Sequence, residues 1–136
     1  MIIVSGASSG ICRKILPVFC KKDKVVAITN SRPVMHDNCV NLRMDFMKKE
    51  SFRVLEDIEY DRKITFISFA ARTKDQLLVN LTEQQFSQSF DVNVMSNFRI
   101  IKHIIPKMIA SKWGRIIFIS STRALRGDIG IFDYSV

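Results

Sequence analysis

Short apolar stretches alternate with longer amphipathic stretches along this chain, and the alternation limits the folds that it can adopt. Residues 2–5, 25–29, 40–44, 64–69 and 115–120 have the apolar, β-branched content of buried strands. Helical spacing is found at 11–21, at 48–58 and in a long segment after Thr82. Strands joined by right-handed crossover helices pair in parallel, with helices on both faces of the sheet. The sequence therefore predicts a doubly wound parallel α/β fold with about five strands.

Local signals indicate where the predicted helices begin, bend and end. Thr82, followed three residues later by Gln85, matches a capping box and predicts a helix start. Pro17 lies inside the first predicted helix and predicts a kink, because proline removes a backbone hydrogen bond. Gly114 predicts the end of the long helix.

Length and composition narrow the class of protein. The 136 residues suit one domain, with a core of ordinary size. No apolar run approaches the roughly 18 residues of a membrane span, and the first residues lack the basic and apolar regions of a signal peptide. Cys12, Cys20 and Cys39 are odd in number and match no metal-ligand spacing. We therefore expect a cytoplasmic protein with reduced thiols, without a metal site and without a membrane partner.

The net charge of +8 leaves three interpretations open. A basic surface can be merely solvated, can attract an anionic small molecule or an acidic carrier protein, or can bind nucleic acid. The basic residues are spread along the chain in short doublets such as Lys21-Lys22 and Lys48-Lys49. Because nucleic-acid affinity requires a concentrated basic surface, no nucleic-acid partner is expected.

A glycine-containing turn joins the first predicted strand to the first predicted helix, with the sequence Ser5-Gly-Ala-Ser-Ser-Gly-Ile-Cys12. Glycines in this place let the backbone turn tightly and approach a pyrophosphate, whose charge the helix amino terminus stabilises. The turn could also be only a turn. Its position at the first strand of an alternating α/β pattern favours a dinucleotide ligand.

The spacing G-x-x-x-G-I-x resembles the short-chain dehydrogenase/reductase family, whose turn is T-G-x-x-x-G-I-G. Ser5 replaces the threonine conservatively, and Cys12 stands in place of the last glycine. The resemblance implies a Rossmann-like fold and a nicotinamide cofactor. It also implies that the Cys12 side chain lies where helix and cofactor approach each other closely.

Other positions match the family over essentially the whole chain. The resemblance implies that Asp45, followed by Phe46, contacts the adenine amine, and that Asn93 is the catalytic asparagine, whose backbone distortion holds a water in the proton relay. Ile67-Ser-Phe-Ala-Ala71 stands where the family has V-N-N-A-G, a departure. The segments after residues 71, 90 and 111 are most similar to the 3-oxoacyl-[acyl-carrier-protein] reductase branch. The implied cofactor-binding set is Gly6, Ser8, Ser9, Gly10, Ile11, Asn30, Arg32, Asp45, Phe46 and Ala70.

The end of the second predicted strand bears on the choice of cofactor. NAD-specific members place an acidic residue there, which accepts hydrogen bonds from the ribose and repels a 2′-phosphate. This chain has Thr29-Asn-Ser-Arg32 and no acid. We therefore expect NADP(H) in preference to NAD(H), unless Arg32 serves only a solvent-facing turn.

Ser121 follows an apolar strand and precedes Tyr134 by thirteen positions, as in the active site of the family. Hydride transfer to a ketone develops negative charge on oxygen, which requires a hydrogen-bond donor and then a proton. The resemblance assigns these tasks to Ser121 and Tyr134. The family's lysine four residues after the tyrosine lies beyond Val136. We therefore expect a chain truncated after the active-site tyrosine, which alone binds cofactor weakly and turns over slowly.

Alternatives and partners follow from the same residues. A catalytically silent dinucleotide-binding module or sensor would share the fold, and the nucleotide-sugar modifying relatives are a further alternative because of their similar fourth strand. The substrate is expected to be a small or acyl-carrier-bound carbonyl compound. Lys112 and Arg115 are the expected contact for an acidic acyl-carrier protein, and the full-length protein is expected to form homo-oligomers.

Overall fold

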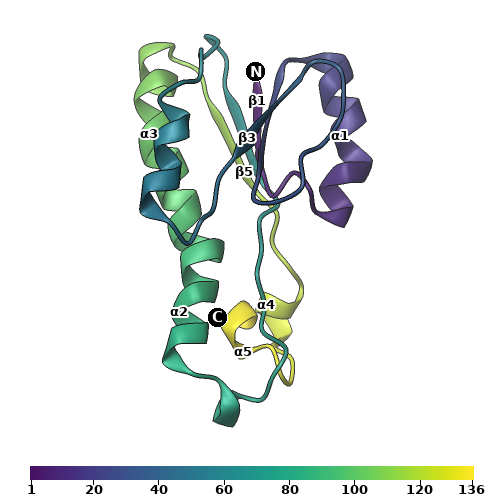
Figure 1. Ribbon diagram of the computed structural model, residues 1–136, viewed down its shortest axis with the longest axis vertical. Helices are drawn as coiled ribbons and strands as arrows, with labels where there is room; N and C mark the ends of the chain where they lie inside the picture. Colours follow the sequence, from purple (N-terminus) through teal and green to yellow (C-terminus); the bar gives the residue numbers. More distant parts are fainter.

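The computed structural model describes residues 1–136 and contains one five-stranded sheet. Its strands are β1 (Ile2–Ser5), β2 (Val25–Thr29), β3 (Cys39–Arg43), β4 (Thr65–Ser68) and β5 (Arg115–Phe118). All neighbouring strands pair in parallel, in the order β3-β2-β1-β4-β5 (Figure 1). The predicted parallel α/β fold is thus confirmed, and no strand end differs from its predicted position by more than two residues.

β1 lies at the centre of the sheet, with Ile2 opposite Val25 of β2 and Thr65 of β4. The chain proceeds outward through β2 and β3 and then returns to the other side of β1 for β4 and β5. At the carboxyl ends of β1 and β4, the Ser5 hydroxyl donates a hydrogen bond to the Ser68 hydroxyl over 3.1 Å. Ligands of such sheets bind beyond the carboxyl ends of the strands, where the strand order reverses. The topology therefore places a site beyond these two serines.

One face of the sheet is covered by α1 (Gly10–Lys22). Its buried residues Cys12, Leu16 and Cys20 recur every fourth position and pack with Val4, Val25, Ala27 and other apolar side chains of the sheet. The Ser9 hydroxyl caps the helix by accepting a hydrogen bond from the Cys12 N–H over 3.3 Å. Pro17 lies inside the helix, which continues beyond it to Lys22.

A long helical segment, drawn in green in Figure 1, covers the opposite face with its last part and extends past the carboxyl end of the sheet with its first part. It comprises α2 (Glu83–Phe90), a π-helical turn η3 (Asp91–Met95) and α3 (Ser96–Ala110). The predicted capping box at Thr82 is confirmed. Ile100, Ile104 and Met108 of α3 are buried against the sheet, in a cluster that includes Phe66. The π-helical turn lies at the position where a backbone distortion was expected, and the helix predicted to end at Gly114 ends at Ala110.

The shorter elements differ more from expectation. The helix predicted at 48–58 is the shorter 3-10 helix η1 (Lys49–Leu55), of which only Leu55 is fully buried. The connection between β2 and β3 contains no helix. A second 3-10 turn, η2 (Leu78–Asn80), precedes α2, and two four-residue helices, α4 (Arg123–Arg126) and α5 (Phe132–Ser135), follow β5. These last two helices lie beyond the carboxyl end of the sheet (Figure 1).

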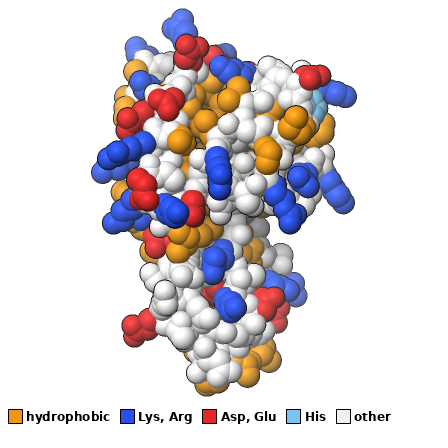
Figure 2. Space-filling model, in the orientation of Figure 1, with side chains coloured by type: hydrophobic (Ala, Val, Ile, Leu, Met, Phe, Trp, Pro, Cys, Tyr) orange, Lys and Arg blue, Asp and Glu red, His pale blue; other side chains and the backbone are white.

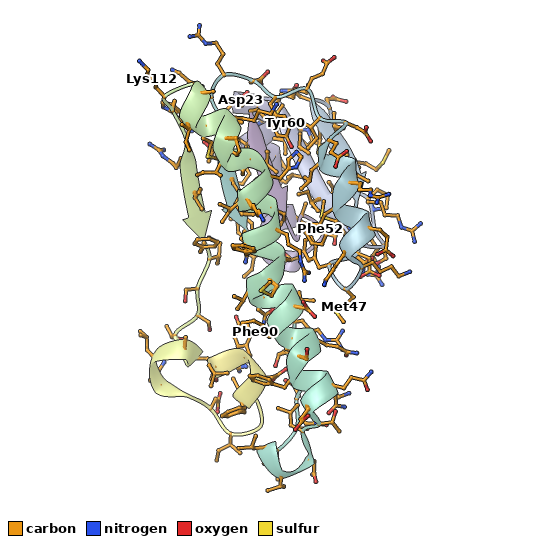
Figure 3. All side chains as sticks on the ribbon, turned by 90° about the vertical axis from the view of Figure 1, so that its left-hand side faces the viewer. Asp23, Met47, Phe52, Tyr60, Phe90 and Lys112 are labelled. Carbon is orange, nitrogen blue, oxygen red and sulfur yellow. The ribbon has the colours of Figure 1, made fainter.

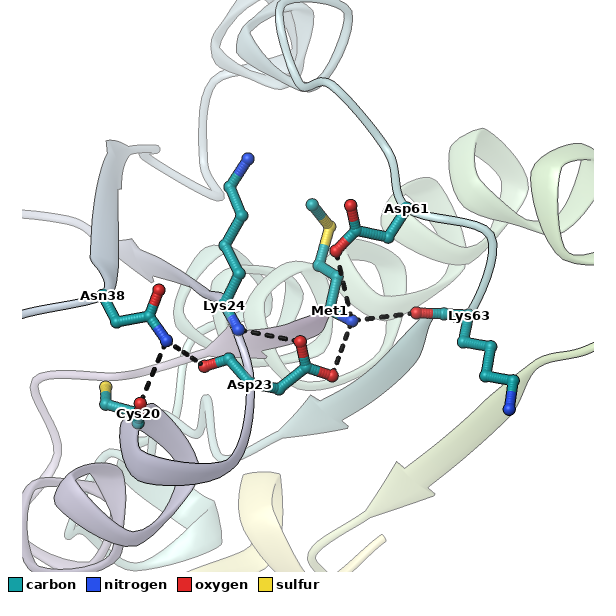
Figure 4. A network of polar contacts seen from close by, with 7 residues as sticks. All are labelled: Met1, Cys20, Asp23, Lys24, Asn38, Asp61 and Lys63. Atoms are coloured by element: carbon teal, nitrogen blue, oxygen red, sulfur yellow. Dashed lines mark hydrogen bonds and ion pairs between the residues drawn. The ribbon is translucent and has the colours of Figure 1, made fainter.

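A polar network closes the opposite, amino-terminal end of the sheet (Figure 4). The Met1 amino group donates hydrogen bonds to Asp23 Oδ2 over 2.8 Å and to the Lys63 carbonyl over 3.0 Å. It also lies 3.4 Å from Asp61 Oδ2. The Asn38 amide adds bonds to the carbonyls of Cys20 and Asp23. These contacts stabilise the amino-terminal end of the sheet and take no part in the site expected at the carboxyl ends of the strands.

The surface carries its positive charge in dispersed form. Figure 2 shows Lys and Arg side chains scattered over the visible face and interspersed with Asp and Glu. None of the helices combines the length and the apolar content that crossing a membrane would require. No group of three or more His, Cys, Asp or Glu side chains is arranged to hold a metal ion.

Candidate active site

Three adjoining cavities lie beyond the carboxyl ends of the strands, and Ala71, just after β4, lines all of them. We call them the nucleotide cavity, of about 530 Å³, the junction cavity, of about 580 Å³, and the apolar cavity, of about 470 Å³. Every predicted site residue except Arg32 lines at least one of them. The carboxyl end of the sheet therefore gathers residues that are far apart in the sequence.

The nucleotide cavity contains most of the predicted cofactor residues, namely Gly6, Ser8, Ser9, Asn30, Asp45, Phe46 and Ala70. Asp45 follows β3, and its Oδ1 accepts a hydrogen bond from the Met47 N–H over 3.0 Å. Arg32 lies outside the cavity, exposed in the connection after β2. The assignment of Arg32 to the cofactor therefore remains a prediction, since the chain leaves the cavity directly after Asn30.

The two glycines of the first turn meet different requirements. Gly6 has a φ of +67°, and a Cβ there would lie 2.5 Å from the Ala70 nitrogen, so the turn itself requires glycine. A Cβ at Gly10 would meet no protein atom within 4 Å. Gly10 instead lines the junction cavity, at the amino terminus of α1. The free space at this helix terminus fits the pyrophosphate of a dinucleotide.

The Cys12 side chain does not lie where the family resemblance implied. It is fully buried in the cluster between α1 and the sheet, and it lines none of the three cavities. Burial raises the pKa of its thiol to about 11, so the group is neutral at physiological pH. The replacement of the family's glycine is therefore accommodated in the core.

The junction cavity brings Ser121 and Tyr134 together beside the glycine turn. Ser9, Gly10 and Ile11 also line this cavity, as do the exposed residues Lys14 and Ser120. Lys14 is its only charged lining residue. It stands four residues after Gly10, and side chains of a helix lean toward its amino terminus, which directs the ammonium group to the turn. Sequence reasoning missed Lys14, although its spacing from Gly10 was a usable signal.

Asn93 lies in the π-helical turn and lines the apolar cavity. The wider turn is recorded by the bond from the Ser96 N–H to the Asp91 carbonyl, five residues back. The Asn93 carbonyl accepts a 2.8 Å hydrogen bond from the Asn97 amide. The backbone distortion expected at Asn93 is therefore present, which supports its assignment to the site.

The Asn93 side chain pairs with the backbone of Arg72. Its Oδ1 accepts from the Arg72 N–H over 2.7 Å, and its Nδ2 donates to the Arg72 carbonyl over 2.8 Å. The Arg72 guanidinium also bonds to Gln88 Oε1 over 3.0 Å. Arg72 lines the nucleotide cavity, so it supplies a cation near the predicted cofactor residues. Sequence reasoning missed it, because nothing in the local sequence indicates the pairing with Asn93.

The apolar cavity adjoins Ser121 and Tyr134 on the side of α2 and α3. Its walls are mainly aromatic and aliphatic side chains: Phe86, Phe90, Val94, Phe98, Ile101, Phe118 and Ile119. The position of α5 depends in part on a ring contact between Phe86 and Phe132, with centroids 5.9 Å apart. A cavity of this kind can hold the apolar part of a substrate next to a polar reacting group.

Lys112 and Arg115 do not lie at this site. Arg115 begins β5, and Lys112 precedes it, so both are at the amino-terminal end of the sheet. Figure 3 shows Lys112 at the same end of the long axis as Asp23 and Tyr60, whereas Phe90 of the apolar cavity lies toward the other end. The expected carrier contact is therefore separated from Ser121 by the whole length of β5.

Comparison with a family model and with known relatives indicates the same family of proteins. The family model described as short chain dehydrogenase matches residues 1–136. A 3-oxoacyl-[acyl-carrier-protein] reductase from Rickettsia prowazekii is 29% identical over 139 residues, and one from Rickettsia conorii is 30% identical over 141. Each alignment covers 97% of this chain and 58% of the relative. The chain thus spans under two thirds of the length of these relatives.

A similar solved structure is that of 4-hydroxyisoleucine dehydrogenase complexed with NADH and succinate. It superimposes with a TM-score of 0.81 at 24% sequence identity. The match covers 99% of this chain and 65% of that one. At this identity the likeness establishes the fold.

Proposed function

The chain belongs to the short-chain dehydrogenase family, and from that premise we propose that it reduces a ketone to an alcohol with a nicotinamide dinucleotide. The observation that carries the proposal is the junction cavity. Ser121 and Tyr134 come from the two sides of α4, and the cavity places both beside Gly10 of the first turn. A hydroxyl pair next to a phosphate-accepting turn suits carbonyl reduction.

Three side chains, those of Ser121, Tyr134 and Asn93, would have separate roles in the reduction of the ketone. The residues of the nucleotide and junction cavities would hold a nicotinamide cofactor, which would supply a hydride to the carbonyl carbon. The Ser121 hydroxyl donates a hydrogen bond to the carbonyl oxygen, where negative charge develops. The Tyr134 hydroxyl transfers its proton to the same oxygen, which becomes the alcohol. Asn93 holds the backbone of Arg72 and thereby the wall between the nucleotide and apolar cavities.

NADP(H) is the proposed cofactor. The nucleotide cavity contains Asn30 at the end of β2, and no carboxylate follows at residues 31–33 to repel a 2′-phosphate. Arg72 lines the same cavity and Lys14 the adjoining one, and both cations favour a phosphate-rich ligand. Asp45 is proposed to bind the adenine amine.

A 3-oxoacyl group, free or bound to a carrier, is the proposed substrate class, because the apolar cavity adjoins the hydroxyl pair. A carrier docked at Lys112 and Arg115 would have to reach past six residues of extended chain, about 20 Å, to deliver its thioester to Ser121. Arg123 and Arg126 of α4 are exposed beside Ser121. We therefore propose these arginines as the contact for an acidic carrier protein.

The test compares the unmodified chain with Tyr134→Phe and Ser121→Ala. The assay follows NADPH oxidation by absorbance with S-acetoacetyl-N-acetylcysteamine as substrate, and cofactor binding by fluorescence. Loss of the proton donor should lower kcat by about 100-fold or more, since general acid catalysis contributes 10² to 10⁴. Loss of the Ser121 hydroxyl should have an effect of similar size. The Kd for NADPH should stay within about twofold in both variants, because neither hydroxyl is assigned to cofactor binding.

Tyr60→Phe is the matched control. The Tyr60 hydroxyl donates to the Leu55 carbonyl over 2.9 Å, away from the three cavities. This variant should keep the full rate. A Tyr134→Phe variant with unchanged kcat would contradict the proposal, and cofactor binding without any turnover would instead select a dinucleotide-binding module.

A further inference from the structure

Asp133 immediately precedes Tyr134 and is almost completely buried, with 5% of its surface exposed. Its Oδ2 accepts a hydrogen bond from the Ser89 hydroxyl, which is fully buried on α2. The same oxygen accepts from the Lys74 N–H over 2.9 Å. Oδ1 is also buried and has no hydrogen-bond partner in the protein. The two donors to Oδ2 therefore provide the compensation that the protein offers for burying this carboxylate.

These two hydrogen bonds join three separate segments: the one that carries Tyr134, helix α2, and the connection that follows β4. The Tyr134 segment has few other polar attachments, although Ile131 is buried with 5% of its surface exposed. Helix α5 is four residues long, and residues 122–129 before it are all exposed. The other contacts of this segment include the Phe86–Phe132 ring pair and the bond from the Gln76 N–H to the Gly130 carbonyl, next to the buried Ile131. The carboxylate is thus the main polar attachment of the tyrosine segment to the helices.

The hydrogen bond from the Lys74 N–H also connects the Asp133 carboxylate to the segment that lines the nucleotide cavity. Arg72 and Thr73, directly before Lys74, line the nucleotide cavity. The Asn93 side chain fixes the backbone of Arg72 through two hydrogen bonds. The segment 72–74 therefore touches the nucleotide cavity at one end and the Asp133 carboxylate at the other.

We propose that Asp133 is a positioning residue that holds the Tyr134 hydroxyl in the geometry needed for proton transfer. The role rests on the proposed function of Tyr134. It acts through the two hydrogen bonds to Oδ2, and any acceptor oxygen in the same place serves. Reacting groups misplaced by about 1 Å lose roughly 100-fold in rate, so release of this segment should be visible in kcat.

The test uses Asp133→Asn, Asp133→Ala and Ser89→Ala, with Asp128→Ala as control. Asp133→Asn retains an acceptor oxygen for both donors, and Ser89→Ala removes one donor only. Asp128 lies in the same exposed segment and pairs with Arg123 over 3.5 Å, but takes no part in the attachment. The substrate is S-acetoacetyl-N-acetylcysteamine, with kcat, KM and the NADPH Kd measured for each variant.

We expect Asp133→Ala to lower kcat by about 10- to 100-fold, with the NADPH Kd unchanged. Asp133→Asn should restore kcat to within about threefold, Ser89→Ala should be intermediate, and Asp128→Ala should match the unmodified chain. A purely structural role would change cofactor binding and kcat together. Equal kcat in Asp133→Ala and the unmodified chain, or failure of Asp133→Asn to restore it, would overturn the proposal.

A second readout does not depend on turnover. With 3-fluorotyrosine incorporated, the chain gives ¹⁹F signals from its two tyrosines, of which Tyr60 serves as internal reference. The Tyr134 signal should move toward the position of free fluorotyrosine in Asp133→Ala and stay in place in Asp133→Asn. An unmoved Tyr134 signal in Asp133→Ala refutes the positioning role. If Asp133→Ala folds poorly, Ser89→Ala takes its place, and an unmoved Tyr134 signal in that variant refutes the role in the same way. A moved signal in a chain without turnover would show that Asp133 holds Tyr134 in place, but it would refute the proposed reduction and with it the role of this positioning in proton transfer.

Discussion

Replacing Gly6 and Gly10 by alanine should separate a glycine that the fold requires from one that the ligand requires. At Gly6 the φ of +67° places any L-residue in the left-handed region, which costs about 1–2 kcal/mol. The new Cβ would also lie 2.5 Å from the Ala70 nitrogen, and overpacking of this kind costs about 1–3 kcal/mol. We therefore expect Gly6→Ala to lower the free energy of unfolding by about 2–5 kcal/mol.

Gly10→Ala is the matched variant, since its Cβ would meet no protein atom within 4 Å. Gly10 is the first residue of α1, where alanine is favoured over glycine by up to about 1 kcal/mol. Its stability should therefore be equal to or slightly above that of the unmodified chain. Its NADPH affinity should fall by about tenfold or more, because the methyl group occupies the space where the backbone must approach the pyrophosphate.

Urea unfolding followed by circular dichroism, together with NADPH fluorescence titration, measures both effects. With a urea slope of about 2 kcal/mol/M, the midpoint of Gly6→Ala should fall by roughly 1–2.5 M. Equal midpoints for Gly6→Ala and the unmodified chain would refute the steric argument. A Gly10→Ala variant that binds NADPH normally would refute the assignment of Gly10 to the cofactor.

Three further outcomes are expected. Thr82→Ala removes the capping box and should lower the free energy of unfolding by about 1 kcal/mol in urea titration; an unchanged midpoint would contradict the role of the cap. The Met1 amino group holds the pKa of the half-exposed Asp23 carboxyl below its ordinary value of 3.8, so its stabilisation is complete above pH 3.8 and is lost as the pH falls further. Asp23→Asn should therefore cost at most about 1 kcal/mol at pH 7 and progressively less below pH 3.8. Burial should protect Cys12 from iodoacetamide at pH 8 in the folded chain but not in urea, as mass spectrometry can establish; rapid native labelling would contradict its buried position.

Regular elements with strong local signals were predictable from the sequence. Strands β1, β2 and β4 are runs of β-branched and apolar residues buried on both faces, so composition alone indicates them. The capping box at Thr82 is equally local. The glycine turn could be placed because it follows the first such strand, and its cavity position agrees with that interpretation.

Features that depend on tertiary contacts were not predictable. The backbone distortion at Asn93 was expected from the family resemblance alone, but the pairing of the Asn93 side chain with the backbone of Arg72, 21 residues away, was not. The attachment of Asp133 to Ser89 joins residues 44 positions apart. The sequence also does not specify the direction of the chain after β2, so the position of Arg32 outside the cavity could not be predicted from its neighbour Asn30.

Transfer of deuterium from nicotinamide-labelled [4-²H]NADPH to a ketone tests the central claim most directly. The unmodified chain, incubated with ethyl acetoacetate and each of the two labelled stereoisomers of NADPH, should give 3-hydroxybutyrate ester that carries deuterium at the carbinol carbon from one stereoisomer only. Tyr134→Phe should form this product at least about 100-fold more slowly. An unmodified chain that binds NADPH and forms no labelled alcohol, or a Tyr134→Phe variant that forms it at the same rate, would contradict the account.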